Sequence, residues 1–166
     1  MKKRGLKTNE FIAPASLLKR FLSYFIDLFI INFIIILPFE KILKNIIPSN
    51  SFSESYQYIQ NNPGVGNLIF FLSIIIGILM VVYFTVFEYL MQQTPGKILM
   101  KQYIIKETGQ PLKLINYIVS NLTFIPIFPF ILLWIIDPIH MIISSKNQRL
   151  MERFTRILVV EKYSFK

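Results

Sequence analysis

Three charged side chains stand out because they lie inside, or at the edge of, strongly apolar stretches. Arg20 and Asp27 are seven residues apart, which on a helix is two turns, ~10.5 Å along the axis and almost the same face. Asp137 lies in a later apolar stretch. Because an ionisable group inside hydrocarbon costs at least ~2.5–3.5 kcal/mol, we expect these side chains to face protein, a counter-ion or water. We interpret them as an intramembrane charged cluster that a proton, a small cation or a small solute could use.

The pairing of these charges is open to two interpretations. In one, the long Arg20 side chain carries its charged group to the membrane surface, and Asp27 has only a packing role in the helix bundle. In the other, Arg20 forms an ion pair with Asp27 or Asp137, because an unpaired carboxylate in hydrocarbon is the costlier state. We favour Asp137, since a residue on a neighbouring helix can approach side-on. Pro138 removes the hydrogen bond to the carbonyl of Trp134, and a carboxylate beside a broken turn suits a cation or a proton.

Two further polar residues are secondary candidates for the same chemistry. Glu88 ends a long apolar segment, at a level where interfacial water could solvate its carboxylate. His140 lies one helical turn after Asp137 and could relay protons, because imidazole changes its charge near neutral pH. The alternative is that each is an ordinary polar residue near the membrane interface, satisfied by its neighbours.

No constellation of residues in the chain predicts catalysis. The sequence has no cysteine and a single histidine, and it lacks the H-E-x-x-H and G-x-S-x-G motifs of hydrolases. The segment Thr94-Pro95-Gly96-Lys97 ends like a phosphate-binding loop, but the earlier glycine is missing and Ile98 replaces the hydroxyl that would hold magnesium. We therefore expect a protein that is not an enzyme and that has no catalytic residue, cofactor or bound metal.

The composition of the chain predicts a membrane protein. Hydrophobic residues make up 54% of it and charged residues 16%, which is more apolar and less charged than a soluble domain. The formal net charge is +9, but the basic residues flank apolar segments and form no aromatic-studded surface, so we do not expect nucleic-acid binding. The expected partners are the lipid bilayer and either a second copy of the chain or a larger membrane complex.

Two segments are long and apolar enough to be full transmembrane helices. The first, 21–37, is extended by an amphipathic start at Ser16 and is closed by Pro38. The second, 68–89, holds a single charge and gives the strongest transmembrane pattern in the chain. Residues 39–47 show helical spacing with one charged face, which predicts a short helix lying on the membrane surface.

The polar segments predict loops and a small sheet. Residues 38–67 end in a stretch rich in Ser, Asn and Gln, which indicates an extracytoplasmic loop that includes the surface helix. Residues 91–113 hold a tight turn, a β-prone stretch at 102–106 and a second turn, and we expect them in the cytoplasm. The tail at 146–166 holds another β-prone stretch at 156–160. We predict that the two β-prone stretches pair as strands of a small cytoplasmic sheet.

Residues 114–143 are apolar but contain Pro126 and Pro129 near their middle, so they form either one kinked helix or a hairpin of two short helices. Basic residues are enriched on the cytoplasmic side of membrane proteins, and this decides between the two. The eighteen Lys and Arg divide as six before residue 21, two in 38–67, four in 91–113 and six from residue 146 onward. Only 38–67 is poor in them, so we place it outside and both termini, including a tail at 1–15, inside. The resulting even number of crossings favours the hairpin. It gives four membrane helices, two full spans and a Pro-broken pair, in one all-α integral membrane domain over residues 1–166.

Three motifs stand out once these elements are placed. They are the interval from Arg20 to Asp27, the turn Thr94-Pro95-Gly96-Lys97 with the strand and glycine turn after it, and Asp137 with the tail Arg149-Leu150-Met151-Glu152-Arg153. Together they resemble the RDD family of small prokaryotic membrane proteins, over nearly the whole chain from Ser16. The resemblance implies a multi-pass protein of the cytoplasmic (inner) membrane with a link to transport. This chain departs from the family where Met151-Glu152-Arg153 stands in place of the frequent His-Asp before an arginine.

Two functions from different classes remain. In the first, the charged cluster serves the transport of protons, small cations or a small solute. In the second, the protein is a non-transporting accessory or scaffold subunit whose buried charges fix helix pairing within itself, a homo-oligomer or a larger complex. Three or four helices are usually too few to line a path across the bilayer. Transport by this chain would therefore require several copies to associate.

Overall fold

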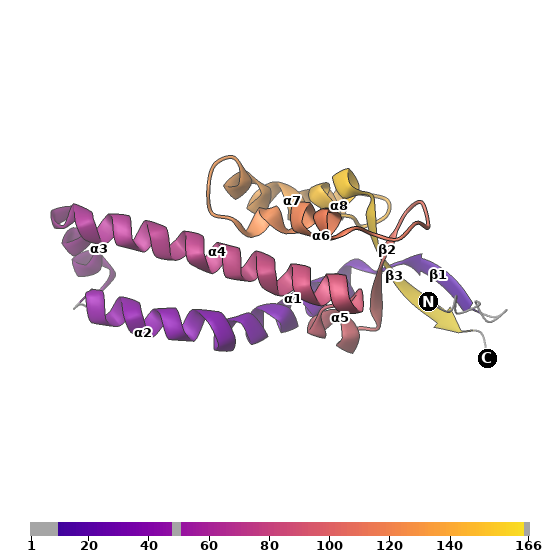
Figure 1. Ribbon diagram of the computed structural model, residues 1–166, viewed down its shortest axis with the longest axis horizontal. Helices are drawn as coiled ribbons and strands as arrows, with labels where there is room; N and C mark the ends of the chain where they lie inside the picture. Colours follow the sequence, from indigo (N-terminus) through magenta and orange to yellow (C-terminus); the bar gives the residue numbers. More distant parts are fainter. Residues whose placement is uncertain (1–9, 48–50, 165–166) are drawn as a thin grey trace.

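The computed structural model describes residues 10–47 and 51–164, which form a mostly helical chain with one small sheet (Figure 1). Of the predicted tail at 1–15, residues 1–9 lie outside the described residues. In chain order the elements are β1 (Glu10–Pro14), α1 (Leu17–Ile31), a π-helical turn η1 (Asn32–Ile36), α2 (Leu37–Ile46), α3 (Phe52–Asn61), α4 (Pro63–Met91), α5 (Pro95–Leu99), β2 (Gln102–Lys106), α6 (Leu114–Asn121), the 3-10 turns η2 (Leu122–Phe124) and η3 (Phe130–Leu132), α7 (Leu133–Ile143), α8 (Leu150–Thr155) and β3 (Ile157–Ser164).

Two long helices run along the molecule and are joined at one end through α3 (Figure 1). One is the continuous run α1–η1–α2, Leu17–Ile46, and the other is α4; by length and composition both could cross a membrane. Only 22% and 17% of their most apolar windows are buried within the structure, so most of this apolar surface faces outward. The predicted helix over 68–89 is confirmed, and α4 extends it at both ends.

The prediction that Pro38 closes the first helix is wrong. The backbone N–H of Leu37 donates to the carbonyl of Asn32, so the hydrogen bonds of η1 run five residues back instead of four. Pro38 then occupies one of the first positions of α2, where the missing N–H of a proline costs little. The helix therefore passes through the proline at a π-turn, and α2 continues α1 instead of lying as a separate surface helix.

The polar segment that we predicted as a loop is largely helical. The helix α3 forms within it and packs against α4 near the far end of the two long helices (Figure 1). Its half-buried residues Ser55, Tyr58 and Ile59 are three and four positions apart, which is the spacing of one helix face. Residues 48–50 of the predicted loop lie outside the described residues.

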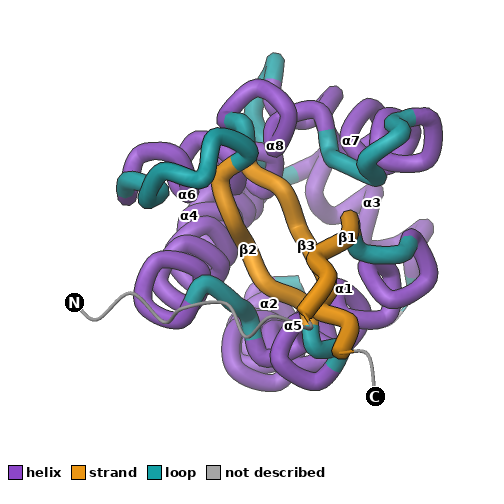
Figure 2. The backbone as a smooth tube through the Cα atoms, turned by 90° about the vertical axis from the view of Figure 1, so that its right-hand side faces the viewer, coloured by secondary structure: helices purple, strands orange, loops and turns teal. Residues whose placement is uncertain are grey.

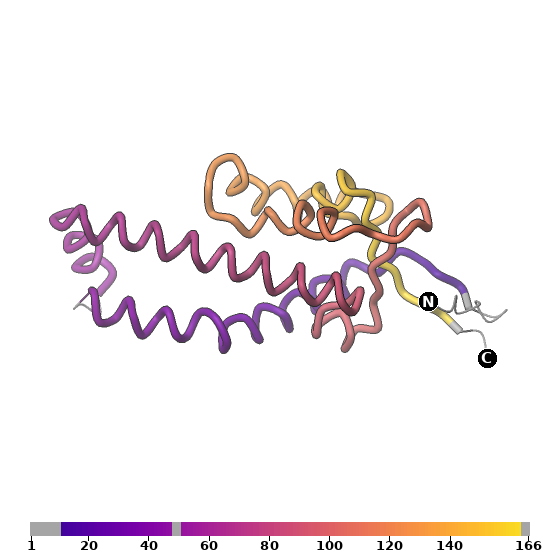
Figure 3. Tube along the Cα trace, viewed as in Figure 1, coloured from indigo at the N-terminus to yellow at the C-terminus, as the bar shows by residue number. Residues whose placement is uncertain are grey.

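The segment 114–143 folds as two short helical arms joined by a turn, as the hairpin prediction required (Figure 3). The helix α6 runs into η2, the chain turns through Pro126 and Pro129, and η3 leads into α7. The turn packs closely on α4: a Cβ built on Gly77 would lie 2.6 Å from Cδ of Pro126. The prolines therefore end the helix here, where no π-turn absorbs the missing hydrogen bonds.

The sheet has three antiparallel strands in the order β1-β3-β2 (Figure 2). The predicted pairing of 102–106 with the tail is confirmed, with Gln102 opposite Glu161 and Lys106 opposite Ile157. Arg156 has a φ of 57° and closes α8, so β3 begins one residue later than predicted and continues to Ser164. The extension of β3 pairs with β1, a strand that the sequence did not indicate to us.

The buried apolar side chains form two clusters. One lies against the sheet and consists of Ala15, Ile104, Tyr117, Ile157 and Val159. The other lies between the long helices and the hairpin and consists of Ile31, Ile35, Val81, Phe84 and Phe124, with the rings of Phe84 and Phe124 stacked 4.5 Å apart. The charged side chains considered next lie at the level between these two clusters.

Candidate functional site

A cavity of about 530 Å³ lies between α1, α4 and the helical hairpin, close to the end of the molecule that carries the sheet. Its walls are apolar along most of their length. At one end, six ionisable residues from α1, α5, α7 and the start of α8 line it: Arg20, Asp27, Lys97, Asp137, Arg149 and Glu152. The cavity therefore joins an apolar chamber to a charged end with three cationic and three acidic side chains.

Asp27 holds the Thr-Pro-Gly-Lys turn against α1. Its Oδ2 accepts a hydrogen bond from the Thr94 hydroxyl at 2.5 Å, and its Oδ1 accepts one from the Gly96 backbone N–H at 2.8 Å and one from the Tyr83 hydroxyl at 3.2 Å. Thr94 also caps α5, because its hydroxyl oxygen accepts a hydrogen bond from the Lys97 N–H at 3.3 Å. Both oxygens of the Asp27 carboxylate are thus satisfied inside the protein.

The glycine of this turn is required by contact with α1. A Cβ on Gly96 would lie 2.0 Å from the carbonyl oxygen of Ser23 and 2.9 Å from the carboxyl carbon of Asp27. No side chain fits in that space, since even a methyl group would overlap the backbone of α1. The motif therefore serves to dock α5 on the middle of α1.

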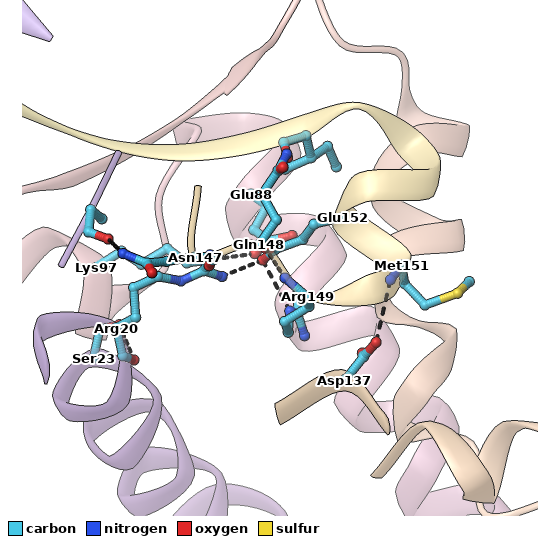
Figure 4. Close-up of polar contacts among 12 residues, drawn as sticks. Arg20, Ser23, Glu88, Lys97, Asp137, Asn147, Gln148, Arg149, Met151 and Glu152 are labelled. Carbon is cyan, nitrogen blue, oxygen red and sulfur yellow. Dashed lines mark hydrogen bonds and ion pairs between the residues drawn. The ribbon is translucent and has the colours of Figure 1, made fainter. Parts of the chain in front are cut away.

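Glu88 is buried, at 2% exposure, and pairs within the protein instead of lying in interfacial water. Its Oε1 lies 2.5 Å from Nζ of Lys97 (Figure 4). Its Oε2 accepts a hydrogen bond from the side-chain amide of Asn121 at 2.9 Å. The contact joins α4, α5 and α6. Lys97 lines the cavity, and Glu88 lies behind it.

The prediction that Arg20 pairs with Asp27 or Asp137 is wrong, because its partner is Glu152. The Nη2 of Arg20 donates to Oε1 of Glu152 at 2.5 Å, and its Nη1 donates to the carbonyl oxygen of Asn147 (Figure 4). Side chains on a helix lean toward its N-terminus, so Arg20 reaches back toward the sheet, where α8 docks, and away from Asp27 two turns further on.

Glu152 lies between two guanidinium groups. Its Oε1 also accepts a hydrogen bond from Nε of Arg149 at 2.9 Å, and its Oε2 accepts one from the Arg149 backbone N–H at 2.9 Å. Burial alone would raise the pKa of Glu152, but the charges of Arg20 and Arg149 hold it at about 2. The carboxylate is therefore ionised throughout the physiological pH range. Glu152 belongs to Met151-Glu152-Arg153, the segment in which this chain departs from the frequent His-Asp before an arginine.

Asp137 differs from the other buried carboxylates of this site. Its Oδ1 accepts a hydrogen bond from the backbone N–H of Met151 at 3.3 Å, while its Oδ2 has no hydrogen-bond partner among the described residues. The side chain is only 3% exposed and lines the cavity. Asp27, Glu88 and Glu152 each accept hydrogen bonds on both oxygens. Asp137 is thus the buried acid of the site with one oxygen that accepts no hydrogen bond of good geometry from a described residue, although the Thr123 hydroxyl and the Arg149 guanidinium lie near its carboxylate.

His140 points away from the cavity and toward α8. Its Nδ1 lies 2.8 Å from the carbonyl oxygen of Gln148, which places the ring proton there, and its Nε2 accepts from Nη1 of Arg153 at 3.4 Å. The histidine does not line the cavity, so the structure does not place it on a proton path through Asp137.

The structure thus brings Arg20, Asp27 and Asp137 to one cavity without pairing them to one another. The sequence analysis missed Arg149 and Glu152 as site residues. The signal that could have identified them is the tail motif itself, which holds Arg149, Glu152 and Arg153 within five residues.

Comparison with known proteins gives one match. No curated protein and no solved structure matches the chain. The family model of the RDD family matches residues 14–156, which include both motif aspartates, the Thr-Pro-Gly-Lys turn, the hairpin and α8. This match covers most of the chain, so the protein belongs to the RDD family, a family of membrane proteins.

Proposed function

We propose that this protein is a membrane transport module in which Asp137 takes up and releases a proton or a small cation, or contacts a small solute, inside the cavity. The observation that carries the proposal is the free Oδ2 of Asp137, buried in a cavity whose other acids are fully paired. An unpaired carboxylate at such a site is costly, and a proton or cation lowers that cost by neutralising it. Ionisable groups inside membrane domains commonly mark such pathways.

The proposed placement in the prokaryotic cytoplasmic membrane follows from the outward-facing apolar surface of the two long helices and from the basic residues. The sheet, the Thr-Pro-Gly-Lys turn and both termini would lie in the cytoplasm, and α3 would lie outside. The described chain supports this orientation because Lys19, Lys101, Lys146 and Lys162 gather around the sheet end. In this orientation the charged end of the cavity lies near the cytoplasmic side of the bilayer.

The paired charges have a supporting role in this proposal. Arg20–Glu152 and Lys97–Glu88 fix α1, α4, α5 and α8 around the cavity. Arg149 stays charged: burial alone would lower its pKa, but Glu152 and Asp137 raise it. A fixed guanidinium near Asp137 would weaken the hold on a proton or cation and so favour its release. Copies of the chain would associate to complete the wall of a path.

The test is flux into liposomes that contain only this protein, followed with a pH-sensitive dye under sodium and potassium gradients. We expect proton or cation movement with the wild type and its loss with Asp137→Asn. The control is Glu107→Gln, which removes an exposed ion pair with Lys146 outside the cavity. Thermal unfolding in detergent checks that both variants fold. Equal flux through Asp137→Asn and wild type would reject the role of Asp137.

A second candidate function is an accessory or scaffold subunit, and one observation favours it. The other buried acids of the site pair with protein groups from several elements, which suits a structural lock as well as a pathway. In this alternative the free oxygen of Asp137 would bind a group from a partner chain. Absence of flux in liposomes, together with the loss of a co-purifying membrane protein from Asp137→Asn, would favour the scaffold over the transporter.

A further inference from the structure

Two polar groups of the cavity have unused hydrogen-bonding capacity. One is Oδ2 of Asp137, an acceptor. The other is the guanidinium of Arg149, whose Nε donates to Glu152 while its two terminal nitrogens make no hydrogen bond within the described part of the chain. A guanidinium carries five N–H groups, so most of this donor set points to no protein partner.

These two groups face one cavity without meeting each other. Both line it, and no ion pair joins them among the residues described (Figure 4). A cation rich in donors and an anionic acceptor therefore line the same cavity, near enough to attract each other but without a direct ion pair among the described residues. The complementary ligand has an anionic group for Arg149 and, next to it, a cationic group with N–H donors for Asp137.

The rest of the cavity fits an apolar chain attached to such a head. Its walls include Met80, Phe84, Phe124, Leu133 and Met141. The volume of about 530 Å³ lies in the range of pockets that hold small organic ligands. Two lining residues, Tyr24 and Trp134, are 38% and 55% exposed, so the cavity reaches the surface of the molecule beside them. This opening is where acyl chains would meet the protein.

We propose that this cavity binds a phospholipid with an ethanolamine headgroup. The phosphate accepts hydrogen bonds from the terminal nitrogens of Arg149, and the primary ammonium donates to Oδ2 of Asp137. One of its two acyl chains lies along the apolar walls. A choline headgroup carries the same charges but has no N–H, so it cannot donate to Asp137. The inference goes beyond transport, because it concerns occupancy of the cavity and holds whether or not ions move.

The test compares phosphatidylethanolamine with phosphatidylcholine of identical acyl chains. Each lipid is added to the delipidated protein in detergent, and bound lipid is counted by native mass spectrometry. We expect phosphatidylethanolamine to bind roughly tenfold more tightly, the ratio that a charge-assisted hydrogen bond of about 1.4 kcal/mol gives. Asp137→Asn should remove most of this preference, and Glu107→Gln should keep it. Leu133→Trp, which narrows the apolar part, should weaken binding of both lipids alike.

Three outcomes would overturn the proposal. One is equal binding of the two lipids to the wild type, and another is an unchanged preference in Asp137→Asn. The third is that soluble phosphoethanolamine binds as tightly as the lipid, which would make the headgroup alone the ligand. The flux assay separates this inference from the proposed function: a lipid preference that depends on Asp137 in a protein without flux would support the lipid site and reject transport.

Discussion

Arg20 illustrates how the buried charges are paired at the level of single residues. It is 6% exposed, and Glu152, its partner, is 1% exposed. Removing one partner of such a pair leaves the other charge in a poorly solvated place, which costs about 3–5 kcal/mol when no second partner remains. Here Arg149 still contacts Glu152, so part of that cost is avoided.

We expect Arg20→Ala to lower the free energy of unfolding in detergent by about 2–3 kcal/mol, below the range for a fully unpaired charge. In a Glu152→Gln background the same substitution should cost less, because no buried negative charge is then left without Arg20. Lys44→Ala, which removes the exposed pair with Glu40, is the control and should change stability by less than about 0.5 kcal/mol. An equal cost of Arg20→Ala in the wild-type and Glu152→Gln backgrounds would contradict the pairing.

Gly96 gives a second test at the residue scale. Its substitution by alanine places a methyl group against the backbone of α1, so we expect a loss of at least about 1–3 kcal/mol of stability and a lower folded yield. Gly64→Ala is the matched control, since a Cβ at that position would meet nothing within 4 Å and alanine favours helix. Both are measured by thermal unfolding of the purified variants. Equal effects of the two substitutions would show that the turn does not dock as described.

Among the helices and strands, those determined by a local sequence pattern could be predicted. Those that depend on contacts with other elements could not. The helix α4 was predictable because its apolar run has no internal proline. The prediction that the helix ends at Pro38 was wrong because a π-turn before the proline accommodates its missing N–H. Such a turn has no sequence signature that we could use. The pairing of β2 with β3 followed from two β-prone stretches, whereas β1 contains a proline and its strand conformation depends on pairing with β3.

The sheet gives a prediction about pH. Burial alone would raise the pKa of Glu161, but hydrogen bonds from Lys19 and from the Ser16 backbone N–H lower it below the ordinary value of 4.5. A group with a lowered pKa in the folded state stabilises the fold above its unfolded pKa, and that contribution is lost as the pH falls. The wild type should therefore unfold at a higher temperature than Glu161→Gln at pH 7, and the difference should shrink below about pH 4.5. A difference that is independent of pH would contradict the assignment.

At the scale of the whole molecule, the sequence identified three of the charged residues that line the cavity but neither their partners nor Arg149 and Glu152. Arg20, Asp27 and Asp137 all line the cavity, because their charge inside apolar segments already required a protein environment. Their contacts could not be predicted, since these depend on how α5 and α8, far along the chain, dock against α1. Likewise, the hairpin could be predicted from the sequence, but the packing of its turn on Gly77 could not.

The orientation in the membrane is tested by single cysteines in a chain that has none of its own. We expect Cys at Gln57, on α3, to react with an impermeant maleimide added to intact cells, because the proposed topology places α3 outside. Cys at Ser164, at the end of β3, should react only after the membrane is opened. Labelling of the Ser164 position from outside intact cells would contradict an even number of crossings.

The central claim is that Asp137 is the buried acid of this site that can exchange its partner. The direct measurement is modification by dicyclohexylcarbodiimide, an apolar reagent for protonated carboxyls, with the modified residue located by peptide mass spectrometry. We predict modification at Asp137, slowed by high sodium or lithium if a cation competes for Oδ2, and little at Asp27, Glu88 and Glu152, whose oxygens all accept hydrogen bonds. Modification of any of these three ahead of Asp137, or none at Asp137, would contradict the account.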